Sequence, residues 1–176
     1  MAEEVIKINR APVMALWASV VSERLGFEHE EALTLGKVVT GLNAQAKGQR
    51  LSIYDPAEGK GELARERKPD ERYFIEILGR PVPVMNTEQG IRAMNKDVPV
   101  EPDSVQRYLE KKFGESLDDV RSAMQELARS YKPEQLARLA YSLYEKFRPK
   151  IPEGVKGWGA AGDLDLALIR SLGKRD

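Results

Sequence analysis

The sequence contains no cysteine, a single histidine and no long apolar run, and each of these absences excludes a class of protein. Without cysteine the chain forms no disulfide, carries no thiolate nucleophile and holds no cysteine-bound zinc or iron–sulfur cluster. The longest apolar stretch, residues 13–21, is interrupted by Ser19 and is far shorter than the roughly 20 residues that cross a membrane. Because Glu3 and Glu4 also argue against a basic leader segment, we expect a cytoplasmic protein with no membrane partner.

The sequence also has no net excess of positive or negative charge. The 176 residues include 28 Lys or Arg and 28 Asp or Glu, and the two signs are mixed evenly along the chain. Proteins that bind nucleic acid draw most of their affinity from phosphate neutralisation and usually show a basic stripe. The charge balance therefore disfavours nucleic acid as a partner and favours a well-solvated surface rich in ion pairs.

The spacing of apolar residues predicts one predominantly helical α+β domain over residues 1–176. Helices are expected over residues 12–25, 28–47, 87–94, 103–113, 117–131, 133–147 and 163–172. Short strands are expected over residues 51–54, 73–78 and 81–85, and the last two form a hairpin whose turn at Gly79–Arg80 suits type II′. We expect a helical hairpin and the C-terminal helices to pack around this small antiparallel sheet. Residues 55–72 are predicted to be a mobile charged connection, and residues 148–162 a loop rich in proline and glycine.

Several single residues refine this prediction. Gly36 and Gly41 lie inside the second helix, where each costs about 1 kcal/mol relative to alanine, so we expect another backbone to approach them closely. Pro81 and Pro83 cannot donate to a ladder, which marks their strand as an edge. Ser116 is expected to cap the helix that follows it, with Asp119 completing a capping box.

The residues that could carry catalysis all have a simpler structural explanation. His29 lies among glutamates at a helix start, where acidic residues complement the helix dipole. Asp163 and Asp165 could hold a divalent cation, but residues two apart do not share a helix face, and Asp163 suits the N-cap of the last helix. Gly59–Gly61 is too short for a phosphate-binding loop. We predict no cofactor, no metal site and no conventional enzyme, with a carboxylate- or metal-dependent enzyme as the weakest alternative.

The segment from Lys146 to Trp158 is the one stretch with binding character, because its basic residues exceed its single acid by three. A tryptophan between glycines offers a stacking face beside these cations, as in proteins that bind single strands. The same tryptophan could instead fold back over the end of the core. The candidate partner-binding residues are Arg148, Lys150, Lys156 and Trp158.

Four stretches resemble a family of small bacterial proteins of uncharacterised activity: INRAPVMALWASVVSERLGF, GLNAQAKG, SVQRYLEKKFG and PEGVKGWGAAGDLDL. They lie at residues 8–27, 41–48, 104–114 and 152–166, so the resemblance spans most of the chain. It implies a bacterial protein but no activity, cofactor or functional residue. The predicted function is therefore a structural or protein-interaction module, with a protein partner or self-association, and nucleic-acid binding through residues 146–158 is the alternative.

Overall fold

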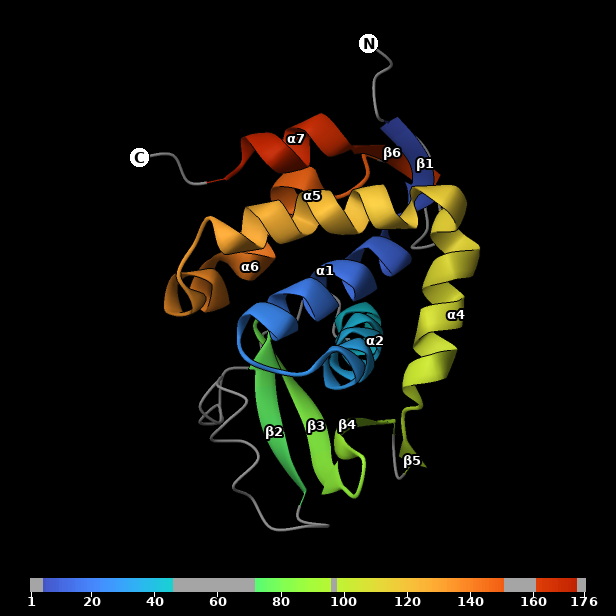
Figure 1. The fold of residues 1–176 in the computed structure, drawn as a ribbon, viewed down its shortest axis with the longest axis vertical. Coiled ribbons are helices and arrows are strands. Elements are labelled where there is room, and N and C mark those ends of the chain that lie inside the picture. Colours follow the sequence, from blue (N-terminus) through green and yellow to red (C-terminus); the bar gives the residue numbers. More distant parts are fainter. Residues whose placement is uncertain (1–4, 46–71, 96–97, 151–160, 174–176) are drawn as a thin grey trace.

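A computed structural model describes residues 5–45, 72–95, 98–150 and 161–173, and it confirms a predominantly helical α+β fold (Figure 1). The helices are α1 (Arg10–Arg24), α2 (His29–Gln45), α4 (Pro102–Phe113), α5 (Leu117–Arg129), α6 (Pro133–Phe147) and α7 (Leu166–Ser171), with a 3-10 turn at Gly114–Ser116. The strands are β1 (Val5–Asn9), β2 (Arg72–Ile77), β3 (Arg80–Thr87), β4 (Gly90–Asn95), β5 (Val98–Pro99) and β6 (Ala161–Asp165). Helices α1 and α2 lie between the sheet β2-β3-β4-β5 and the helices α5, α6 and α7, and α4 runs along their side (Figure 1).

Helix α1 is enclosed by other elements and forms the centre of the molecule. It packs against α2, α4, α5 and α6, and every residue from Pro12 to Ser22 is buried. The sequence analysis predicted a single apolar face for this helix, whereas the structure buries all of its faces between Pro12 and Ser22. Two serines are tolerated inside because their hydroxyls bond within the helix, for example Ser22 to the Ala18 carbonyl at 2.8 Å. On the α6 side, the Trp17 indole N–H donates to the Ala140 carbonyl at 2.9 Å.

Helices α1 and α2 form the predicted hairpin, and a glycine allows their close contact. A Cβ atom on Gly36 would lie 2.3 Å from the Ala15 carbonyl oxygen of α1, so only glycine fits there. The same expectation was wrong for Gly41, because a Cβ atom there would have no neighbour within 4 Å among the described residues. The connection ends in Gly26, whose φ of 107° favours glycine.

The predicted hairpin of β2 and β3 is present, but its turn type and the position of β3 in the sheet differ from the prediction. Its two turn residues are Leu78 and Gly79, with φ values of 52° and 76°, which is the type I′ pattern and not the predicted type II′ turn. Strand β3 also pairs with β4, so the prediction of an edge strand was wrong. Pro81 and Pro83 fit because β4 pairs with β3 only from Val84 onward. Toward β2 the prolines occupy non-hydrogen-bonded positions, which require no N–H donor.

The segment expected to be a helix from Thr87 to Met94 contains strand β4 instead. A two-residue turn leads from Thr87 to Gly90, whose φ is 115°, and the chain then returns antiparallel to β3. Residues 91–94 are all buried, so the strand lacks the alternation by which a half-buried strand is identified in a sequence. Pairing with β3 outweighs the weak local helical preference.

Strands β1 and β6 pair antiparallel in a second sheet, and the sequence analysis predicted neither of them. The last helix therefore begins at Leu166 and not at residue 163. Its N-cap is Asp165, whose Oδ1 accepts from the Ala167 and Leu168 N–H groups at 3.0 and 3.3 Å. Asp163 lies in β6 and forms an ion pair with Lys7, so the prediction that Asp163 caps the helix was wrong.

Three further expectations have mixed outcomes. Ser116 precedes α5, but its side chain makes no capping hydrogen bond, so the predicted capping box with Asp119 is not formed. The predicted strand over residues 51–54 and almost all of the connection over residues 55–72 lie outside the described residues. No helix among the described segments is long and apolar enough to cross a membrane.

Candidate functional site

Two of the four predicted partner-binding residues, Arg148 and Lys150, belong to the described part of the chain. They follow the end of α6, and Lys150 forms an isolated antiparallel bridge with Asp163 of β6. The other two, Lys156 and Trp158, lie outside the described residues. The structure thus brings Arg148 and Lys150 to the junction of α6 and β6, beside the start of α1.

A residue that the sequence analysis missed completes this junction. The Arg10 side chain, at the first position of α1, donates from Nε to the Pro149 carbonyl at 2.9 Å. The Tyr144 hydroxyl donates to the Arg10 carbonyl at 3.4 Å, so backbone and side chain of Arg10 both contact the end of α6. We call Arg10, Tyr141, Tyr144 and Arg148 the arginine corner. Arg10 and Pro149 are 139 positions apart, which explains why no local pattern indicated the corner.

The arginine corner contains two guanidinium groups whose charges act on each other. Burial lowers the pKa of Arg10, and the neighbouring Arg148 guanidinium lowers this pKa further, while Tyr144 and Tyr141 act in the opposite direction. Burial also raises the pKa of the Tyr144 phenol well above its usual range, so this hydroxyl stays protonated. Helix α1 adds no acidic residue in its first turn. Among the described residues, neither guanidinium of the corner forms an ion pair.

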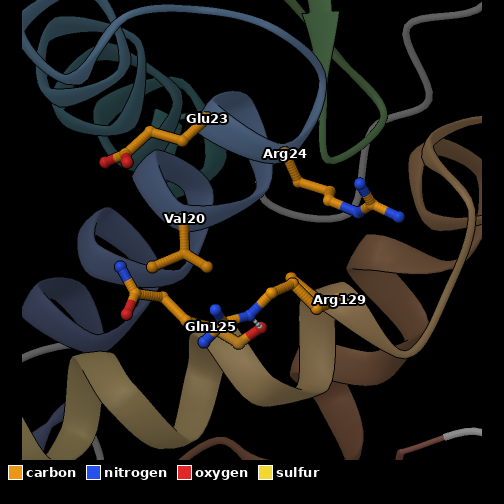
Figure 2. Close-up of a pocket in the computed structure, with 6 residues that line it drawn as sticks. Val20, Glu23, Arg24, Gln125 and Arg129 are labelled. Atoms are coloured by element: carbon orange, nitrogen blue, oxygen red, sulfur yellow. Dashed lines mark hydrogen bonds between the residues drawn. The ribbon is translucent and has the colours of Figure 1, made fainter.

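A second candidate is a hollow between α1 and α5 (Figure 2). Its floor is apolar and its rim is polar, and the lining residues are Val20, Glu23 and Arg24 from α1 and Gln125, Ala128 and Arg129 from α5. We call it the α1–α5 hollow. Figure 2 shows Val20 facing α5, with Gln125 and Arg129 lying along the opposite wall. Both floor residues, Val20 and Ala128, are almost fully buried.

The charged residues at the α1–α5 hollow are two arginines and one glutamate. Arg24 is anchored to the Tyr131 carbonyl, which accepts from Nε at 3.2 Å and from Nη2 at 2.8 Å. Arg129 Nε donates to the Gln125 carbonyl one turn earlier in α5, at 3.3 Å. Glu23 points away from Arg24 (Figure 2) and contacts His29 Nδ1 at 2.9 Å. Within the described residues, both guanidinium groups therefore lack a carboxylate.

The residues considered for catalysis have structural partners. His29, the only histidine, begins α2 and binds Glu23, as expected for an exposed helix start. Asp165 caps α7 and Asp163 pairs with Lys7. In the part of the chain that the structure describes, no three His, Asp or Glu side chains gather as metal ligands.

A buried polar cluster joins α2 to β4, and the sequence analysis did not identify it. The Glu31 side chain, 1% exposed, accepts from the Glu28 N–H through Oε1 and from the Ile91 N–H through Oε2, each at 2.9 Å. The Thr34 hydroxyl accepts from the Ala93 N–H at 3.0 Å. Glu31 and Thr34 thus accept hydrogen bonds from alternate N–H groups of β4, as the carbonyl groups of a neighbouring strand would. We assign the cluster a structural role.

No protein-family model, curated protein or solved structure matches this chain. The resemblance to a family of bacterial proteins stays a prediction.

Proposed function

We propose that the protein is a non-enzymatic interaction module whose α1–α5 hollow binds an acidic segment of a partner protein. The observation that carries the proposal is the pair of guanidinium groups, Arg24 and Arg129, which lie beside an apolar floor and form no ion pair within the described residues. A partner that places one carboxylate on each arginine and an aliphatic side chain on Val20 and Ala128 would satisfy both features.

Three physical arguments support a protein partner. Arginine is enriched at the centres of interfaces because its planar fork matches a carboxylate and its stem packs against apolar surface. The hydrogen bonds from Arg24 to the Tyr131 carbonyl hold its guanidinium in place, which lowers the entropy lost on binding. The walls are two helices of the core, so the hollow is formed on rigid elements.

Fluorescence anisotropy with two synthetic peptides tests the proposal. The probe is a fluorescein-labelled ten-residue peptide of alternating glutamate and leucine, and the comparison peptide replaces each glutamate with lysine. We expect the full chain to bind the acidic peptide and not the basic one. Arg129→Gln should weaken binding about tenfold or more, equivalent to about 1.4 kcal/mol, because it removes one charge-assisted contact.

Two further variants make the result specific. Gln125→Trp should also weaken binding, because a large side chain on the rim covers the floor while both arginines remain. Arg138→Gln, an exposed change on α6, serves as the matched control and should bind as the unmodified protein does. Equal binding of the two peptides, or equal losses in Arg138→Gln and Arg129→Gln, would overturn the proposal.

A further inference from the structure

The arginine corner is distinct from the α1–α5 hollow, and it lies where α1 begins and α6 ends. We propose that the corner is a binding site for a phosphate group, which Arg10 and Arg148 contact together. The ligand class is a phosphate-bearing molecule, either a small phosphate compound or the backbone of a single-stranded nucleic acid. This inference does not depend on the function proposed for the hollow.

The geometry brings two cations together. The bond from Arg10 Nε to the Pro149 carbonyl places Arg10 beside the residue that directly follows Arg148. One bond uses one of the five N–H donors of Arg10, so the terminal nitrogens stay available for a ligand. Arg148 is half-buried at the C-cap of α6 and makes no side-chain hydrogen bond within the described residues.

The Arg10 and Arg148 guanidinium groups are near enough to repel each other, and a bound anion would relieve that repulsion. A dianionic phosphate offers several acceptor oxygens and can take a bidentate contact from each arginine, which a single carboxylate cannot do as well. The lowered pKa of Arg10 has the same physical origin, because burial and Arg148 both act against its charge. A bound phosphate would reverse that penalty.

The aromatic residues beside the two arginines hold the corner in place. Tyr141 and Tyr144 contact each other with ring centroids 6.0 Å apart, and Tyr144 packs edge-on against Phe147, so this wall is ordered. The Tyr144 hydroxyl already donates to the Arg10 carbonyl and holds that residue. Lys146 and Lys150 are exposed at the same end of α6 and extend the positive field around the corner.

Isothermal titration with inorganic phosphate is the first measurement, at low ionic strength and with the full chain. We expect saturable binding that Arg10→Gln and Arg148→Gln each weaken at least tenfold. Arg10→Lys should recover only part of the affinity, because lysine keeps the charge and loses the planar fork. Arg138→Gln, which lies on the same helix, is the control and should leave the affinity unchanged.

A second arm distinguishes the two sources of phosphate. A single-stranded oligonucleotide should bind with the same dependence on Arg10 and Arg148 if the ligand is nucleic acid, and its affinity should fall steeply with salt. Binding of inorganic phosphate without the oligonucleotide would assign the corner to a small phosphate compound. Thermal unfolding of each variant without ligand verifies that it is folded. The proposal is overturned if the protein binds no phosphate, or if both glutamine variants bind it unchanged.

Discussion

The contacts of α2 with α1 and with β4 are made in opposite ways. Toward α1 the contact is apolar and so close that Gly36 meets the Ala15 carbonyl with no space for a methyl group. Toward β4 the contact is polar, and Glu31 and Thr34 accept from the backbone N–H groups of Ile91 and Ala93. The first contact should be sensitive to added volume, and the second to the loss of an acceptor. Two sets of variants test that difference, and a third variant tests the contact between α1 and α6. They are ordered from the largest expected effect to the smallest.

Adding a single methyl group at the α1 contact should have the largest effect. Gly36→Ala forces a Cβ atom to 2.3 Å from a carbonyl oxygen, so the helices must separate, and we expect a loss of about 3 kcal/mol in the free energy of unfolding. Urea denaturation measures this loss. Gly41→Ala is the matched control in the same helix. Its Cβ atom meets nothing, so we expect it to stabilise the protein by about 0.5–1 kcal/mol. Similar effects of the two changes would contradict the close contact.

Removing one acceptor at the β4 contact should have an intermediate effect. In Glu31→Gln the side chain keeps its shape but turns an NH₂ group toward one of two N–H donors, those of Glu28 and Ile91. We expect a loss of about 1–3 kcal/mol in the free energy of unfolding, measured by the same denaturation. The neighbouring Glu30→Gln should cost less than about 1 kcal/mol, because Glu30 is exposed and its contact with Arg92 is long, at 3.6 Å. If Glu30→Gln costs as much as Glu31→Gln, the acceptor role is wrong.

The contact between α1 and α6 should add a smaller, pH-dependent effect. Burial raises the pKa of Tyr144, so the folded protein keeps this proton at a pH where the unfolded chain has lost it. The stability from the neutral phenol is complete below about pH 10 and falls as pH rises, by up to about 1.4 kcal/mol per pH unit. Tyr144→Phe should therefore show a shallower alkaline decline in unfolding free energy than the unmodified protein. Equal slopes above pH 10 would contradict the burial of this phenol.

The helices could be predicted from the sequence more fully than the strands, for a physical reason. Regular apolar spacing indicates a helix locally, and α4, α5 and α6 lie close to their predicted bounds. Strands β1 and β6 are stabilised by each other across most of the chain, and β4 by acceptors from α2, so their own residues give little signal. The candidate sites show the same difference between local signals in the sequence and long-range contacts. The basic excess identified Arg148 and Lys150, whereas Arg10, Arg24 and Arg129 required the tertiary contacts.

The pairing of β1 with β6 has a consequence for how the chain folds. Val5 lies opposite Asp165, so this ladder closes a loop that contains nearly every other element, and loop closure of that length is slow. During synthesis on the ribosome, β1 emerges early and finds its partner only after β6 has been made. Helix α1 follows β1 directly and is buried from Pro12 to Ser22, so its apolar residues stay exposed until α2, α4, α5 and α6 have been made. The central helix of the fold therefore gains its full packing only late in synthesis, after α6 has emerged.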